Sequence, residues 1–302
     1  MRLFERSMKY VRPALLIIVI VLLAYLIHRA GPKTLLDIVL RLSPGWVAAS
    51  LAFWAVNLSI ASARYRSLAA RELKYSQVLE VILASYLLNY ASMVQGIGIG
   101  AKVGLMKGRR VPASRSLAGA GGEVIFDLLF TGMVAAVFAG YVGWSKSGMG
   151  DLHPAVLLIA VLAAISAGVG LLIFAKISGF GARMVEVLKD AFAPSRLPLN
   201  FISTAGIWTA AAASYYCMIR AAGELVPPFL TLAALSVGFV AGLISLVPGG
   251  LGVRDVTWAY VCSTAGAPIT VTATAAFALR LLVILSVAVA LGAWTLLGRR
   301  GD

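Results

Sequence analysis

The sequence predicts an all-α, polytopic integral membrane protein, a helical bundle with two re-entrant helical hairpins that form an inverted-topology repeat. Three observations predict this fold. Hydrophobic residues make up 61% of the 302 residues. Charged residues make up only 13%, about half the fraction usual in soluble domains. Long apolar segments recur from end to end, and two glycine-rich stretches interrupt them.

Apolar segments define the predicted elements in chain order, because a spanning helix needs about 20 residues. The candidate segments are 13–28, 44–63, 76–95, 116–142, 152–175, 200–222, 228–247 and 269–297. Two further pieces, 101–110 and 251–265, are too short to cross. Each is therefore predicted to fold back on the segment before it. The chain, residues 1–302, is interpreted as a single membrane domain.

Basic residues predict the orientation, because cytoplasmic loops collect Lys and Arg. If the N-terminus is cytoplasmic and both short pieces turn back, most of the 26 basic residues lie inside. The inside clusters run from Arg64 to Lys74, Lys107 to Arg115 and Lys176 to Arg196, with Arg299 and Arg300 at the end. We therefore expect a multi-pass protein of the cytoplasmic (inner) membrane with both termini in the cytoplasm. The net charge of +14 reflects this rule and attraction to lipid headgroups. It does not favour nucleic acid, because the basic residues sit in short loops.

Two glycine-rich stretches predict the internal repeat. Residues 96–103 read GIGIGAKV and residues 248–255 read PGGLGVRD. They align without a gap, so that Lys102 falls on Arg254, and each precedes a long span with a charged residue. The first half, 10–142, would hold a re-entrant unit near 76–110, and the second half, 152–297, one near 228–265. The predicted topology brings these units in from opposite faces, which is typical of an inverted repeat with a midplane binding site. Two unrelated glycine kinks are the alternative.

The same stretches predict an anion-binding site. The glycines are expected to end just before a helix begins, where unpaired N–H groups and the helix dipole attract an anion. Lys102 or Arg254 then adds a full positive charge. Alternatively, Arg254 only pairs with a buried acid. The predicted substrate-binding residues are Arg254, Lys102, Arg280, Gly249, Gly250, Gly252, Gly98 and Gly100.

Three acidic residues are predicted to act in coupling or gating. Glu123 and Asp127 are four residues apart, so they share one helix face, which cannot face lipid. Counted from Ser116, Asp127 lies ~16 Å deep in the membrane. Arg280 lies at a similar depth, so we predict an Asp127–Arg280 pair, either purely structural or a gate that an anion opens. Asp255 is expected to accept a backbone N–H at the start of its helix.

Residues for enzymatic chemistry are not evident. The sequence contains no HExxH, Asp-x-Asp or P-loop motif and no Cys–His set. Cys217 and Cys262 have neither the spacing nor the setting of a metal or redox site. We predict no enzyme activity, no catalytic residue, no metal and no cofactor. The six Trp residues fall mostly towards span ends, as in an interfacial aromatic belt.

The stretch LVPGGLGVRD, with a central Arg in the following span and GE…D in an upstream span, carries a family resemblance. Over residues 10–297, the chain resembles the transmembrane flippase-like domain of the lysylphosphatidylglycerol synthases, which has stand-alone relatives in bacteria and archaea. The resemblance implies two re-entrant units and movement of an anionic or aminoacylated lipid between leaflets. It is not expected to extend to lipid synthesis, because no soluble synthase domain follows. The first half departs from the family pattern, with QGIGIGAK in place of a Pro-Gly-x-x-Gly-Glu-like stretch.

The expected function is a lipid translocase that acts without ATP on an anionic or aminoacylated phospholipid or a polyprenyl-linked lipid. A secondary transporter for a small soluble anion is one alternative. An accessory subunit of a membrane glycolipid or envelope pathway is another. The expected partner is a membrane lipid with an anionic headgroup. A second copy of the chain and a lipid-modifying enzyme are further candidate partners.

Overall fold

The computed structural model describes residues 41–92, 95–145, 181–244 and 253–298, in which every regular element is an α-helix. The helices are α3 (Pro44–Ala69), α4 (Tyr75–Ser92), α5 (Gln95–Gly108), α6 (Ala113–Ser145), α8 (Gly181–Ala191), α9 (Leu197–Ala221), α10 (Pro228–Ile244), α11 (Val253–Ser263) and α12 (Ile269–Gly298). The predicted spans 13–28 and 152–175 lie outside the described residues. So do Gly249, Gly250 and Gly252.

The predicted all-α membrane bundle is confirmed. Three described helices are long and apolar enough to cross a membrane, within Pro44–Ala69, Ala113–Phe138 and Ile269–Ala293. A fourth apolar helix, Pro228–Gly242, is shorter. The apolar segments give the helices close to their predicted bounds, because a segment in lipid must satisfy its backbone groups internally. Helix α8 has mixed polar and apolar residues and was not predicted.

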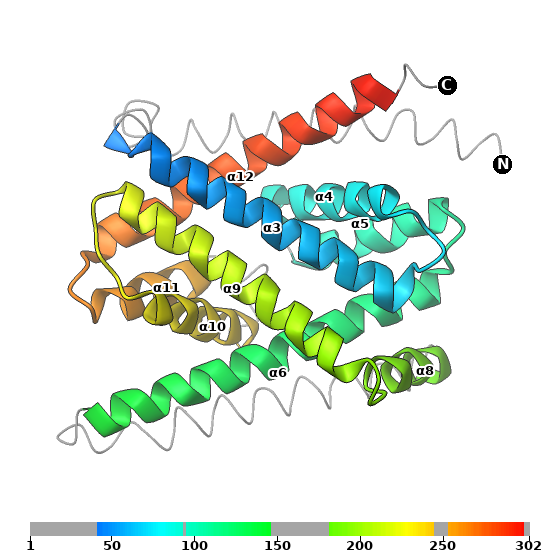
Figure 1. Cartoon of the computed structure of the whole chain (residues 1–302), viewed down its shortest axis with the longest axis horizontal. Helices are drawn as coiled ribbons and strands as arrows, with labels where there is room; N and C mark the ends of the chain where they lie inside the picture. Colours follow the sequence, from blue (N-terminus) through cyan, green and yellow to red (C-terminus); the bar gives the residue numbers. More distant parts are fainter. Residues whose placement is uncertain (1–40, 93–94, 146–180, 245–252, 299–302) are drawn as a thin grey trace.

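The helices pack in two matching sets, as Figure 1 shows. Helices α3 and α9 lie side by side through the middle of the bundle. Helix α4 packs on α5 and on α12, and in the same way α10 packs on α11 and on α6. If α3, α4, α5 and α6 are exchanged with α9, α10, α11 and α12 in that order, the same pairs of helices are in contact. This symmetry agrees with the predicted repeat of two halves.

Polar side chains spaced seven residues apart join the two central helices. Ser50 Oγ donates to the Ser214 carbonyl at 2.8 Å, and Asn57 Nδ2 donates to the Ile207 carbonyl at 2.7 Å. Arg64 continues this row on α3. All three side chains are buried, so they face α9 and not the exterior. Interhelical hydrogen bonds of this kind hold helices together where lipid provides no hydrophobic drive between them.

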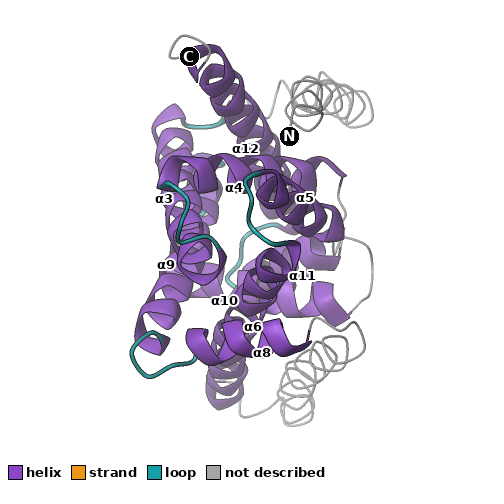
Figure 2. Cartoon of the chain, turned by 90° about the vertical axis from the view of Figure 1, so that its right-hand side faces the viewer, coloured by secondary structure: helices purple, strands orange, loops and turns teal. Residues whose placement is uncertain are grey.

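The two predicted short pieces, α5 and α11, form hairpins with the helices before them (Figure 2). At about 1.5 Å per residue, α11 is about 16 Å long and α5 about 21 Å long. Both are shorter than the ~30 Å hydrocarbon core of a bilayer. Neither second arm is therefore long enough to cross a membrane on its own, as the sequence predicts.

The glycine-rich stretch of the first hairpin differs from the prediction. Helix α5 begins at Gln95, so Gly98, Gly100 and Lys102 lie inside the helix and not before it. The expectation that these glycines end just before a helix start is therefore wrong. In the second hairpin the described part of α11 begins at Val253. The glycines before it lie outside the described residues, so the expected helix start there stays a prediction.

Candidate functional site

A bidentate ion pair joins the centre of the bundle. Arg64 Nη1 lies 2.8 Å from Asp127 Oδ1, and Arg64 Nη2 lies 3.2 Å from Asp127 Oδ2. Arg64 Nη1 also donates to Thr204 Oγ1 at 2.7 Å, and Trp208 Nε1 donates to Asp127 Oδ1 at 3.1 Å. These contacts connect α3, α6 and α9. Both carboxylate oxygens of Asp127 are thus occupied.

A second ion pair lies one helical turn away on α6. Lys102 Nζ on α5 donates to Glu123 Oε2 at 2.6 Å. Arg64 Nη2 is more distant, 3.9 Å from Glu123 Oε1. Lys102 Nζ also lies 4.4 Å from the centre of the Tyr65 ring, within cation–π range. Glu123 and Asp127 share one helix face, as predicted, but each carboxylate is paired with a different cation.

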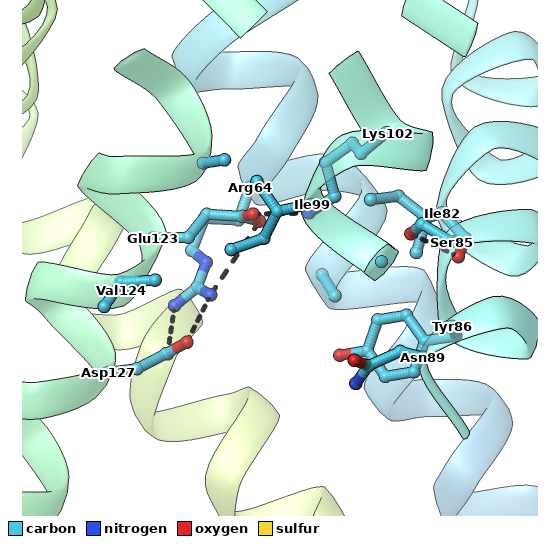
Figure 3. A pocket seen from close by; sticks show the side chains of 13 residues that line it. Arg64, Ile82, Ser85, Tyr86, Asn89, Ile99, Lys102, Glu123, Val124 and Asp127 are labelled. Atoms are coloured by element: carbon cyan, nitrogen blue, oxygen red, sulfur yellow. Dashed lines mark hydrogen bonds and ion pairs between the residues drawn. The ribbon is translucent and has the colours of Figure 1, made fainter. Parts of the chain in front are cut away.

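These charges line a cavity of about 160 Å³ among α3, α4, α5 and α6. Its volume far exceeds the ~10–15 Å³ that a single water needs. Figure 3 shows the charged side chains gathered on one side and the polar side chains of α4 on the other. The lining residues are Ala61, Arg64, Ile82, Ser85, Tyr86, Asn89, Gly98, Ile99, Lys102, Ala120, Glu123, Val124 and Asp127.

Two polar atoms of this lining are buried without a hydrogen-bond partner in the protein, Arg64 Nε and Asn89 Oδ1. The Arg64 side chain is only 3% exposed, so its guanidinium cannot turn to bulk solvent. A buried donor or acceptor left unpaired costs roughly 1–3 kcal/mol. The lining residues therefore include one unpaired donor and one unpaired acceptor, in addition to four charges.

The second hairpin approaches the same region through Arg254, the second residue of α11. Arg254 lies within electrostatic range of Tyr86, as do Arg64, Glu123 and Asp127. Gly238 of α10 lets α11 come close, because a Cβ there would lie 2.9 Å from the Arg254 carbonyl oxygen. Tyr86 thus connects the charges of the first half with the arginine of the second.

Asp127 was predicted to pair with Arg280, and the structure pairs it with Arg64, which occupies both of its oxygens. Helix α12, which carries Arg280, packs on α4, α11, α9 and α3, whereas α6 packs on α10, α8, α5, α3 and α9. The two helices therefore share α3 and α9 as neighbours. Asp255 lies on α11, but its side chain is not among those described.

Sequence reasoning placed Arg64 in a cytoplasmic loop, and this too is wrong. The predicted span ended at residue 63, whereas α3 continues to Ala69. Arg64 is only 5% exposed and points into the bundle. One signal could have located it: Ser50, Asn57 and Arg64 follow a seven-residue spacing, which keeps them on one helix face. Asn89 and Tyr86 carried no comparable signal.

The tryptophans also depart from the prediction. Trp54, Trp208 and Trp258 are buried, so an interfacial belt does not describe them. Trp208 contributes directly to the site through Asp127. Trp46 is 36% exposed, in keeping with the predicted belt. Among the described residues, no group of three or more His, Cys, Asp or Glu side chains could hold a metal ion.

Comparison with known proteins identifies the family. The family model described as the lysylphosphatidylglycerol synthase TM region matches residues 14–292, which is nearly the whole chain. No curated protein matches the chain. No solved structure matches it either. With its helical bundle and its match over both halves, the chain belongs to the family of lysylphosphatidylglycerol synthase transmembrane regions.

Proposed function

We propose that this chain is a lipid translocase that moves a phospholipid or polyprenyl-linked lipid between leaflets without ATP. The headgroup, anionic or aminoacylated, would pass through the charged cavity while the hydrocarbon chains stay in the bilayer. The observation that carries this proposal is the cavity itself, lined by Arg64, Lys102, Glu123 and Asp127 inside an apolar bundle. Charged side chains inside a membrane are costly and mostly mark substrate or ion pathways.

Three features support a headgroup as the guest. Arg64 Nε and Asn89 Oδ1 are unpaired, so a guest with an acceptor and a donor satisfies both. Lys102 holds Glu123 through a single flexible side chain, which a phosphate can draw away. Arg254 adds a cation on the opposite hairpin, within electrostatic range of Tyr86. Phosphate is the natural partner of such cations.

In this proposal the α4–α5 and α10–α11 hairpins enter the membrane from opposite faces without crossing. Both termini lie in the cytoplasm, and the protein sits in the inner membrane, because this orientation keeps most basic residues inside. The chain transports and does not catalyse. Its partner is the membrane lipid, whereas a second copy of the chain and a lipid-modifying enzyme are further proposed partners.

A flipping assay tests this function. The purified chain is reconstituted into liposomes with fluorescent phosphatidylglycerol, and a membrane-impermeant reductant bleaches the label that reaches the outer leaflet. We expect the wild type to expose label from the inner leaflet. Arg254→Ala should slow this exposure about tenfold or more, because a charge-assisted hydrogen bond contributes roughly 1.5–3 kcal/mol.

Arg71→Ala is the matched control. Arg71 is an exposed arginine that pairs with Asp190 at 2.6 Å, outside the cavity. Exposed pairs contribute little to stability, so this variant should flip lipid like the wild type. Flipping by Arg254→Ala at the wild-type rate would remove Arg254 from the site. Uptake of glycerol 3-phosphate without any lipid flipping would instead favour a transporter of soluble anions.

A further inference from the structure

The two carboxylates of the cavity are held in different ways. Asp127 accepts two hydrogen bonds from Arg64 and one from the Trp208 indole N–H. These contacts fix it between three helices. Glu123 depends on one hydrogen bond from Lys102, since the nearest Arg64 nitrogen is 3.9 Å from it. An arginine fork resists displacement, whereas a lysine is a point charge on a flexible stem. An anion that enters the cavity therefore takes Lys102 more readily than Arg64.

The surroundings of Glu123 do not offer a substitute cation. Lys102 comes from α5. Two polar side chains come from α3: Arg64, which donates to Asp127, and Tyr65, whose phenol bonds to Ser116. Helix α4 supplies the Tyr86 phenol. Residues 228–244 of α10 contain no titratable side chain.

The described charged side chains on α8 and α9, the remaining neighbours of α6, are exposed or have other partners. On α8, Glu186 and Lys189 are exposed, and Asp190 pairs with Arg71 and Arg196. On α9, Arg220 lies over the Trp46 ring, with 5.3 Å between its guanidinium carbon and the ring centre. Glu123 is only 7% exposed, so without Lys102 it becomes a buried charge whose remaining ion pair, with Arg64 at 3.9 Å, is shared with Asp127. A buried carboxylate in that position neutralises by taking a proton.

We infer that Glu123 takes up a proton when an anionic headgroup draws Lys102 away, so that headgroup movement is coupled to proton movement. This inference rests on the proposed function and adds an energy source for the movement of the lipid. The proton comes from water in contact with the cavity and forms an O–H bond on the carboxylate. Lys102 remains an ammonium group. When the headgroup leaves and Lys102 returns, the carboxylic acid releases the proton to water, on whichever side the cavity then opens.

Proton uptake on binding is the first test. The purified full-length chain in detergent micelles is titrated with dihexanoyl phosphatidylglycerol in two buffers of different ionisation heat. We expect the wild type to take up about one proton per bound lipid. Glu123→Gln should bind the lipid without proton uptake. Binding by the wild type without any proton exchange, or equal uptake by Glu123→Gln, would overturn the inference.

Matched variants keep this test interpretable. Glu80→Gln makes the same chemical change in the Arg109–Glu80 pair, which joins α4 to the turn after α5, outside the cavity lining. Its proton uptake should equal that of the wild type. Glu123→Asp keeps a carboxylate and should keep the uptake. If Glu123→Gln folds poorly because Lys102 loses its partner, Lys102→Met combined with Glu123→Gln removes both charges and should also abolish uptake.

Flipping under a pH gradient separates this inference from the proposed function. Liposomes containing the wild type should accumulate labelled phosphatidylglycerol in one leaflet when a gradient is imposed, and the asymmetry should reverse with the gradient. Glu123→Gln should lose this response. Flipping with the same leaflet distribution under every gradient would overturn the proton coupling but would still agree with the proposed translocase function. An absence of flipping in all vesicles would overturn both.

Discussion

The two halves of the bundle share one packing plan but place their charges differently. In the first half, α3–α6, two carboxylates and two cations pair inside a cavity. In the second half, α9, α10 and α12 contain no Asp or Glu, and the described helices carry Arg220, Arg254 and Arg280 beside one acid, Asp255. The two acids of the cavity lie on α6, whereas α12, its counterpart in the second half, has no acid.

The two hairpins differ in the same sense. In the first, the glycine-rich stretch is helical and Lys102 is paired within the cavity. In the second, Arg254 is the second described residue of α11. Under the proposed function, the second half attracts an anion and the first responds to it. Four substitution experiments sharpen or break this comparison.

The largest loss of stability is expected on substitution of Arg64. Arg64→Leu leaves the partly buried Asp127 without its cation and should lower the free energy of unfolding by up to about 3–5 kcal/mol. Reversible unfolding in mixed detergent micelles measures the loss. Arg64→Leu combined with Asp127→Leu should recover most of the stability, because no unpaired charge remains. Arg71→Leu should cost less than Arg64→Leu, because the Arg71–Asp190 pair is exposed. Equal losses at the two arginines would contradict this explanation.

The next largest loss of stability is expected at the contact between α10 and α11. A Cβ on Gly238 would lie 2.9 Å from the Arg254 carbonyl oxygen, a backbone atom that cannot move alone. Gly238→Ala should therefore displace α11 and lower stability by about 1–3 kcal/mol. It should also slow lipid flipping, because Arg254 moves with its backbone. Unchanged stability and unchanged flipping would show that the position of Arg254 does not matter.

The glycines of α5 test whether the first hairpin needs flexibility. A Cβ on Gly98 would lie 2.9 Å from Asn89 Cβ and 3.1 Å from the Ser85 carbonyl oxygen, whereas Gly100 has nothing within 4 Å. Gly98→Ala should destabilise the protein, and Gly100→Ala should stabilise it by up to about 1 kcal/mol, because alanine favours a helix. Thermal unfolding compares the pair. Destabilisation by Gly100→Ala would restore the sequence-based prediction of a glycine hinge.

The smallest effects are expected where the hairpins end. Arg110 follows α5 with φ 67°, and Gly266 follows α11 with φ 91°. Both lie in the left-handed region, which costs a non-glycine residue about 1 kcal/mol or more. Arg110→Gly should therefore raise the free energy of unfolding by about 1 kcal/mol, and Gly266→Ala should lower it by a similar amount. The same sign of change at both positions would contradict this explanation.

Much of the fold could be predicted from the sequence, because lipid restricts what an apolar segment can do. The bounds of α6, α9 and α12 and the start of α3 follow closely from segment length and hydropathy, and the hairpins follow from α5 and α11 being too short to cross. The sequence-based prediction failed where backbone conformation depends on packing. The GIGIG stretch was predicted as an irregular segment, yet Gly98 is part of a helix and packs tightly against α4.

The site was predicted only in part. Glu123, Asp127 and Lys102 were identified, because charges inside apolar segments are conspicuous, but their partners were not. Pairing depends on which helices meet, and a repeat relates Asp127 to Arg280 without placing them in contact. Arg64 was missed because it lies near a predicted span end, where arginine is common in membrane proteins. Its partner on α6 is apparent only once α3 and α6 are packed together.

The most direct measurement asks whether a lipid headgroup enters the cavity. Asn89→Cys, in a chain with Cys217 and Cys262 replaced by Ala, places a thiol on the cavity wall. A charged methanethiosulfonate reagent then reports access to that thiol. We predict that dihexanoyl phosphatidylglycerol slows the reaction at this position and does not slow it at Ser59→Cys, which lies outside the cavity lining. A reaction at Asn89→Cys that proceeds at the same rate with and without the lipid would contradict a headgroup path through this cavity.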